Sequence, residues 1–219
     1  MIRFGIVGAG GIAKKFARDI SLVDNAILTA VSARDEETAQ KYKEEYNVKY
    51  AYKSYDLLSK SDKIDAVYIA TPHNFHHDQA IMFMNKGKHV LIEKSVSVNE
   101  KELIEMIEVA KKNKVLLMEA MWTFFLPSTI FVKQKVNELG NLKEAYLDFG
   151  FDLLGNNPKA RILKPELAGG SILDIGVYPI SFYHHLQKTP IKSIEATADF
   201  LDTGVDSECN ILITDELGA

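Results

Sequence analysis

Cysteine is almost absent from this sequence: Cys209 stands alone among 219 residues. A lone cysteine excludes an internal disulfide framework and is typical of a reducing cytoplasm, where we expect this protein. Long apolar runs are missing as well, since none approaches the roughly 20 residues of a transmembrane helix. The apolar start has only Arg3 as a basic flank and is too short for a secretory signal. We therefore expect no membrane partner.

Neither sign of charge dominates, because the formal net charge is −4 and the pI is about 5.9. This balance gives no support for nucleic acid or an anionic membrane as a partner. Metal-ligand spacing is missing too: His76–His77 and His184–His185 are adjacent pairs, and helix neighbours face different directions. We expect no metal. What is present, 47% hydrophobic and 26% charged residues, fits a soluble globular protein.

A glycine-rich turn near the N-terminus is the most informative stretch. Arg3–Val7 is apolar and β-prone, and it leads directly into a G-x-G-x-x-A motif that a helical pattern follows. This order places backbone N–H groups and a helix N-terminus where a dinucleotide pyrophosphate binds. The alternative is an ordinary glycine-rich connection. The predicted cofactor loop comprises Gly8, Gly10, Gly11, Ile12 and Ala13.

Strand-like and helix-like segments alternate down to about residue 120. This rhythm predicts a doubly wound parallel sheet of the Rossmann type, with helices on both faces. Further strands are expected at Ala26–Ser32, Tyr50–Tyr52, Ala66–Ala70, His89–Ile92 and Val115–Met118. Helices are expected at Asp35–Tyr46 with Asp35 as its cap, at His77–Asn85 before Gly87, and from Asn99 to Asn113.

The pattern changes near residue 121, and we expect residues 1–120 and 121–219 to form two domains. Long alternating segments in the second predict an α+β domain with a mostly antiparallel sheet. Its last residues, Asp215–Ala219, look like the start of a hairpin turn, so we expect this domain to be incomplete. Its expected elements are a helix at Pro127–Leu139, a half-buried strand at Leu142–Leu153, a loop at Leu153–Leu167, a helix from Gly169 to Leu186, and strands at Ile191–Leu201 and Ser207–Thr214.

The end of the second strand indicates which dinucleotide binds. An NAD site usually places an acid there for the ribose 2′-hydroxyl, but this strand ends Ser32-Ala33-Arg34. Ser32 and Arg34 are instead suited to a 2′-phosphate. We therefore predict NADP(H). The alternative is that Asp35 supplies the acid and the cofactor is NAD(H).

Two other loops follow strands at the edge where ligands bind in parallel sheets. Glu93-Lys94-Ser95 brings a lysine that can reach a substrate oxygen, although a surface ion pair is an equal reading. Thr71-Pro72 leads to His76, which is either a ligand contact or a packing residue. In the second domain, Asp174 and Tyr178 are four apart on a predicted helix, so they share one face.

In their order along the chain, these segments resemble the Gfo/Idh/MocA oxidoreductase family. The matching stretches are Gly8–Ala13, Thr71–His76 with Ala80, Gly87–Val90, Glu93-Lys94 and Gly169–Tyr178. Glu119–Thr123 resembles the branch that contains dihydrodiol and xylose dehydrogenases.

The resemblance implies an NADP-dependent oxidoreductase that moves a hydride between nicotinamide and a sugar or dihydrodiol-like alcohol. Lys94, Asp174 and Tyr178 would be the catalytic residues, with Tyr178 as general acid/base, Lys94 lowering its pKa from about 10, and Asp174 orienting the substrate or the lysine. A homo-oligomer, specifically a homodimer, is also expected of the full-length protein. Cofactor contacts would come from Gly8, Gly10, Gly11, Ile12, Ala13, Ser32, Arg34, Thr71, Pro72, His76, Glu93 and Lys94.

The sequence departs from the family pattern at two positions beside these residues. Ser95 replaces the usual proline after Glu-Lys, so the loop loses a fixed φ angle. Phe124 replaces an arginine usual in the branch, which removes a polar contact. The chain is also shorter than family members. The alternative function is therefore a non-catalytic or truncated NADP-binding protein of the same fold.

Overall fold

A computed structural model describes residues 1–152 and 160–219 of the chain. The chain divides into two compact units, Met1–Ala120 and Met121–Ala219, and each is described by itself. Within the described residues, no helix is both long and apolar enough to cross a bilayer.

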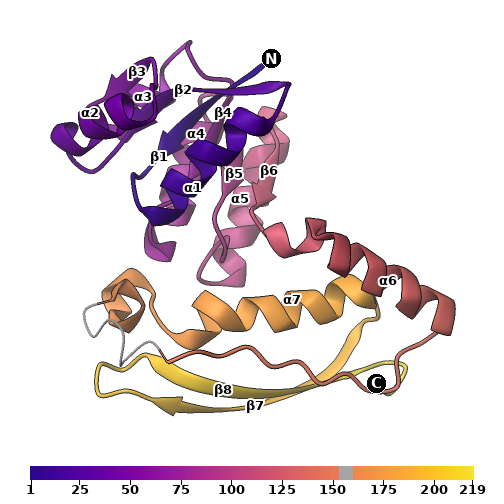
Figure 1. Cartoon of the computed structure of the whole chain (residues 1–219). Helices are drawn as coiled ribbons and strands as arrows, with labels where there is room; N and C mark the ends of the chain where they lie inside the picture. The colour runs from indigo at the N-terminus through magenta and orange to yellow at the C-terminus, as the bar shows by residue number, and fades with distance from the viewer. Residues whose placement is uncertain (153–159) are drawn as a thin grey trace. The chain divides into compact units, whose positions relative to one another are not determined.

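The first unit is built on a six-stranded sheet of order β3-β2-β1-β4-β5-β6 (Figure 1). Every neighbouring pair is parallel, which confirms the doubly wound sheet expected from the sequence. β6 lies slightly later than the strand expected at Val115–Met118. The strands are β1 (Ile2–Val7), β2 (Ala26–Ser32), β3 (Tyr50–Tyr52), β4 (Ala66–Ile69), β5 (His89–Ile92) and β6 (Leu117–Glu119).

Successive side chains of each strand point to opposite faces of the sheet, so both faces are apolar. Helices pack against both of them. On one face Val7 packs with Phe83 of α4 and Met106 of α5. On the other face Ile6 packs with Ala13 of α1 and Tyr42 of α2. The helices are α1 (Gly11–Asp19), α2 (Glu36–Glu45), α4 (His76–Met84), α5 (Glu100–Asn113) and a short α3 (Tyr55–Ser59) that the sequence pattern did not predict.

Polar caps fix where these helices begin. The Asp35 carboxylate accepts from Thr38 N at 2.7 Å, and the Asn99 side chain accepts from Glu102 N at 2.9 Å. Both contacts satisfy backbone donors that a first helical turn leaves unpaired, and both confirm caps expected from the sequence. Gly87, with φ of 71°, follows α4 at its expected end.

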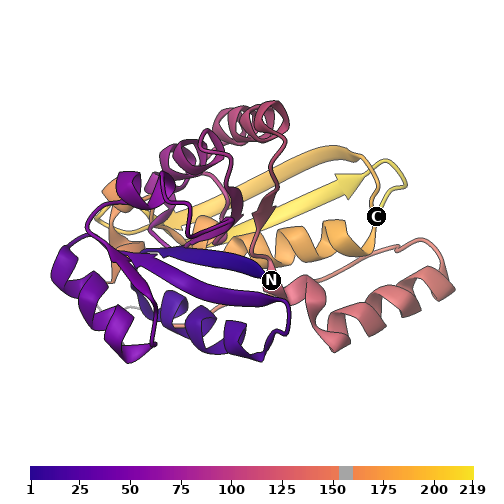
Figure 2. The same ribbon diagram turned by 90° about the horizontal axis from the view of Figure 1, so that it is seen from above.

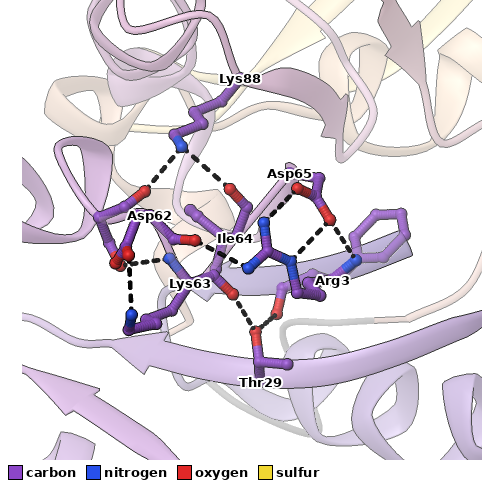
Figure 3. A network of polar contacts seen from close by, with 9 residues as sticks. Arg3, Thr29, Asp62, Lys63, Ile64, Asp65 and Lys88 are labelled. Carbon is purple, nitrogen blue, oxygen red and sulfur yellow. Dashed lines mark hydrogen bonds and ion pairs between the residues drawn. The ribbon is translucent and has the colours of Figure 1, made fainter. Parts of the chain in front are cut away.

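A polar network ties the strands together at the amino edge of the sheet (Figure 3). The Arg3 guanidinium donates from Nε to the Asp65 carboxylate at 2.9 Å and from Nη1 to the Asp62 carbonyl at 2.8 Å. Lys88 Nζ donates to the carbonyls of Ser61 and Ile64 at 2.6 and 2.9 Å. These contacts join the start of β1 to the connections that enter β4 and β5.

The second unit combines helices with a two-stranded antiparallel sheet. β7 (Ile191–Phe200) and β8 (Asp206–Asp215) lie side by side in both views (Figures 1 and 2). The two long strands and the helix before them were expected from the sequence. The helical segments are η3 (Trp122–Phe125), α6 (Pro127–Leu139), η4 (Arg161–Leu163), η5 (Pro165–Leu167), the π-helical η6 (Ile172–Gly176) and α7 (Val177–Leu186).

The strand expected at Leu142–Leu153 was wrong for the residues that the structure describes. Residues 142–152 carry no strand assignment, and nearly all of them are exposed. Alternating apolar residues make a strand only when a neighbouring strand accepts their backbone hydrogen bonds, and this segment pairs with neither β7 nor β8. Residues 153–159 of the loop expected at Leu153–Leu167 lie outside the described residues; the rest of that loop holds η4 and η5.

A buried carboxylate anchors the end of β8. Asp215 is fully buried and accepts hydrogen bonds from Tyr183 Oη at 2.8 Å and Gln187 Nε2 at 2.6 Å, both from the end of α7. The backbone N–H groups of Leu217 and Ala219 donate to its other oxygen. Burial alone would raise the pKa of Asp215, but these hydrogen bonds outweigh it and lower the pKa to about 2.

The Arg3–Asp65 contact makes an acid-stability prediction. Hydrogen bonds from Arg3 lower the pKa of Asp65 to about 2. The contribution of this contact to the free energy of unfolding is therefore complete above the ordinary pKa of 3.8 and is lost as pH falls toward 2. Both side chains are partly exposed, so we expect Asp65→Asn to lower the melting temperature at pH 7 by only roughly 2–4 °C.

The difference between Asp65→Asn and the parent should shrink as pH falls from 4 to 2, measured by thermal unfolding at each pH. Asp24→Asn, at an exposed aspartate before β2, is the control and should leave the dependence of the melting temperature on pH unchanged. A difference that stays constant down to pH 2 would contradict this assignment.

Candidate active site

The carboxyl ends of four parallel strands gather the residues predicted to bind a cofactor. Because β1, β2, β4 and β5 run in the same direction, the loops that follow them leave the sheet at one edge. These loops are Gly8–Gly10 after β1, Ala33–Arg34 after β2, Ala70–Phe75 after β4 and Glu93–Ser95 after β5.

The glycine loop is shaped to receive an anion. Gly8 has φ of 92°, and a Cβ there would lie 2.9 Å from the Ala70 carbonyl oxygen, so only glycine fits without strain. Gly10 is the N-cap of α1, provides no side chain to cap it, and is followed by a first turn without acidic residues. Space beside Gly10 and Gly11 is open to 4 Å. The first N–H groups of α1 therefore fit a pyrophosphate.

Ala13 and Ile12 have different places in this loop. Ala13 is fully buried, and its carbonyl accepts from Tyr42 Oη at 2.6 Å, so it holds α1 close to the sheet. Burial raises the pKa of Tyr42 beyond its usual range, which keeps this phenol a neutral donor. Ile12 is 44% exposed and lies at the open side of the helix start.

At the end of β2, the predicted 2′-phosphate residues are in different environments. Arg34 is exposed, whereas Ser32 is fully buried and its Oγ has no hydrogen-bond partner among the described residues. Asp35 is also exposed, but its carboxylate caps α2, and the Thr38 backbone N–H lowers its pKa. Both charges at this position are therefore exposed, and the alternative acid already has a structural role.

The Lys94 loop is held by side chains from the segment after β4. His73 Nε2 lies 3.1 Å from the Lys94 carbonyl oxygen, and His76 Nδ1 lies 2.8 Å from that of Ser95. The other His76 nitrogen lies 2.9 Å from the Thr71 carbonyl oxygen. Carbonyl oxygens only accept, so both His76 hydrogen bonds form together only when the imidazole carries two protons.

Other predicted residues of this edge also form contacts between loops. Glu93 accepts a hydrogen bond from the Tyr68 hydroxyl on β4. Thr71 Oγ1 donates to Gln79 Oε1 on α4 at 2.6 Å, and Pro72 precedes the short helix η2 (His73–Phe75). His73 and Gln79 were not predicted as site residues from the sequence. Their partners, Lys94 and Thr71, come close to them only when the sheet has formed.

In the second unit, Asp174 and Tyr178 each have a described partner. Asp174 is in the π-helical turn η6, where its carboxylate lies 3.0 Å from Arg161 Nη2. The Tyr178 hydroxyl accepts from Trp122 Nε1 at 3.1 Å, and the ring of Phe149 lies edge-on at 5.5 Å.

The partners of Asp174 and Tyr178, which are Arg161, Trp122 and Phe149, were not among the predicted site residues. Arg161 is 13 positions from Asp174, and no periodicity links them. Trp122 was part of the quoted branch motif but had no assigned role. Phe124, which replaces the usual arginine, stacks on the His185 ring with centroids 4.2 Å apart. Among the described residues, no cluster of His, Cys, Asp and Glu is of a size to bind a metal.

Comparison with known proteins identifies the family. Residues 2–121 match the oxidoreductase family Gfo/Idh/MocA, described as an NAD-binding Rossmann fold, and residues 132–219 match the Gfo/Idh/MocA C-terminal domain. The chain belongs to the Gfo/Idh/MocA family, as the resemblance predicted.

Similar proteins include two named dehydrogenases. The chain is 37% identical over 98% of its length to scyllo-inositol 2-dehydrogenase (NADP(+)) IolU of Bacillus subtilis, covering 66% of that protein. It is 36% identical over 94% of its length to trans-1,2-dihydrobenzene-1,2-diol dehydrogenase of Danio rerio, covering 62% of it. The chain thus spans less than two thirds of these relatives.

Among solved structures, the chain is similar to aldose-aldose oxidoreductase from Caulobacter crescentus complexed with glycerol. The TM-score is 0.91 at 25% identity, over 100% of this chain and 68% of that one. This similarity agrees with a parallel dinucleotide-binding sheet followed by a unit with an antiparallel sheet.

Two glycine substitutions separate folding from anion binding at the glycine loop. Gly8→Ala places a Cβ against the Ala70 carbonyl at a positive φ, so we expect it to destabilise the first unit by roughly 1–3 kcal/mol. Gly10→Ala meets no atom and keeps an ordinary backbone conformation, so we expect only the loss of a glycine N-cap, which costs about 1 kcal/mol or less.

Gly10→Ala should instead weaken NADPH binding at least tenfold, because its methyl group occupies the space where phosphate approaches the backbone. Thermal unfolding and fluorescence titration with NADPH measure the two effects. If Gly10→Ala bound NADPH as tightly as the parent, the pyrophosphate would not lie at this turn.

Proposed function

We propose that this protein is an NADP(H)-dependent oxidoreductase that transfers a hydride between nicotinamide and a sugar or dihydrodiol-like alcohol. The observation that carries the proposal is the sheet edge of the first unit, where the open glycine turn after β1 and the Lys94 loop after β5 leave the same edge of the parallel sheet. The names of the two dehydrogenase relatives support an alcohol or its carbonyl product as the substrate.

The preference for NADP(H) rests on the end of β2. Arg34 is an exposed guanidinium, a group that recognises phosphate through paired N–H donors. Asp35 is engaged in capping α2, which weakens the reading in which it binds an unphosphorylated ribose. The Bacillus subtilis relative is named for NADP(+), which supports the same choice.

Each proposed catalytic residue has a separate task. Bound nicotinamide supplies the carbon that accepts or donates the hydride. In the oxidative direction, Tyr178 takes the proton of the substrate hydroxyl as the carbinol carbon loses its hydride. The Trp122 N–H donates a hydrogen bond to the phenol oxygen and helps to hold the ring of Tyr178 in place. Lys94 supplies a positive charge that stabilises the oxyanion, and Asp174 orients the substrate hydroxyl or the lysine.

A second candidate function is cofactor binding without turnover. Phe124, where the branch usually has arginine, is stacked on His185 and offers no polar contact to a substrate. Ser95 also replaces the proline that would restrict the lysine loop. This reading predicts tight NADPH binding with no activity on any sugar or diol.

Substitution of the proposed catalytic residues tests the reaction. We expect Lys94→Met and Tyr178→Phe each to lower kcat by about 10²- to 10⁴-fold, because each removes a group that acts in the transition state. NADPH binding should remain measurable by fluorescence titration. Lys86→Met and Tyr146→Phe are matched controls at exposed positions and should leave kcat unchanged. Normal kcat in both catalytic variants would refute the assignment.

Substitution of Arg34 tests the cofactor preference. We expect Arg34→Ser to weaken NADPH at least tenfold and to leave NADH nearly unaffected, because only NADPH carries the 2′-phosphate. Arg18→Ser, at the opposite end of α1 from the glycine loop, is the control and should change neither affinity. A parent protein that binds NADH more tightly than NADPH would overturn the proposal.

A further inference from the structure

We propose that Glu119 is a positioning residue that holds the Lys94 loop in place, a role that rests on the proposed function of Lys94. Glu119 is the last residue of β6 and pairs in register with Ile92, the last residue of β5. The Lys94 loop begins one residue after Ile92, so Glu119 lies beside the point where that loop leaves the sheet.

The Glu119 carboxylate contacts the loop directly. Oε1 of Glu119 accepts a hydrogen bond from the Val96 backbone N–H at 2.8 Å. The next backbone contact, from Ala120 N to the Ile92 carbonyl at 2.7 Å, fixes the end of β6 against β5. The short strand β6 thus places the Glu119 carboxylate beside the backbone amide of Val96, two residues after Lys94.

Glu119 completes a set of anchors along three consecutive loop residues. His73 contacts the Lys94 carbonyl, His76 contacts the Ser95 carbonyl, and Glu119 contacts the Val96 amide. The two histidines come from the segment after β4, whereas Glu119 comes from β6 on the other side of β5. The loop is therefore held from both neighbouring strands, which restricts it where Ser95 lacks the ring of a proline.

Charge couples Glu119 to the lysine as well. Burial raises the pKa of Glu119, while the Val96 N–H and the positive charge of Lys94 oppose that rise. Glu119 thus combines a hydrogen bond that orders the loop with a carboxylate charge near Lys94.

Substitutions separate the two effects. In Glu119→Gln the amide oxygen still accepts from Val96 N–H, but the charge is gone; Glu119→Ala removes both. Glu102 is the matched control, because its carboxylate accepts from Val98 N at 3.3 Å, two residues further along the same connection. Glu102→Gln and Glu102→Ala therefore perturb a similar contact away from the lysine.

Two measurements on the full chain do not depend on turnover. Hydrogen exchange at the Val96 amide should accelerate about tenfold in Glu119→Ala and stay near the parent rate in Glu119→Gln. The rate at which an amine-reactive probe labels Lys94 should change at least twofold in Glu119→Ala and stay near the parent rate in Glu119→Gln, because only the alanine variant loses the hydrogen bond that orders the loop. Neither Glu102 variant should change either rate.

Val96 exchange that stays at the parent rate in Glu119→Ala would overturn the positioning role. If Glu119→Ala fails to fold, Glu119→Asp, whose shorter side chain withdraws the carboxylate from the Val96 amide, replaces it in the same measurement. Turnover is measured separately: we expect kcat to fall in Glu119→Ala and to be largely retained in Glu119→Gln. Normal kcat in Lys94→Met alongside faster Val96 exchange in Glu119→Ala would refute the proposed function and leave the positioning role supported.

Discussion

Parallel pairing of β1 with β2 and β4 is the constraint on which the rest of the first unit depends. The Gly8 amide donates to the Ser32 carbonyl and the Ala70 amide donates to the Val7 carbonyl, both at 2.9 Å. These bonds bring the turn after β1 so close to Ala70 that no Cβ fits at Gly8. The turn then leads straight into α1, whose first N–H groups stay open to an anion.

The same parallel geometry explains why the proposed Lys94 site needs anchors. Loops at a sheet edge have few backbone partners of their own, and a reacting group is useful only when its position is fixed. Here His73, His76 and Glu119 supply the missing partners from the strands on either side of β5. At the opposite edge of the sheet, side-chain contacts also hold loops in place, without a proposed reacting group. They are made by Arg3, Asp65 and Lys88.

The second unit places its proposed reactive side chains by a different device. The carboxylate of Asp206 on β8 accepts from Ser171 Oγ at 2.7 Å and from Ile172 N at 2.6 Å, which fixes the start of the helix. The π-helical turn that follows widens the backbone at Asp174 before the regular turns of α7 carry Tyr178. Strand β8 thus fixes where the helical segment that carries Asp174 and Tyr178 begins.

The sequence by itself determined the strands and caps of the first unit, the glycine turn and the family, because short apolar runs, Asx caps and glycine spacing are local signals. Its catalytic roles, cofactor preference and homodimer stay predictions. Only the tertiary structure decided that Ser32 is buried, that Arg161 meets Asp174 and that Glu119 reaches Val96. It also overturned the strand at Leu142–Leu153, since a strand depends on a neighbour that the segment's own residues do not encode.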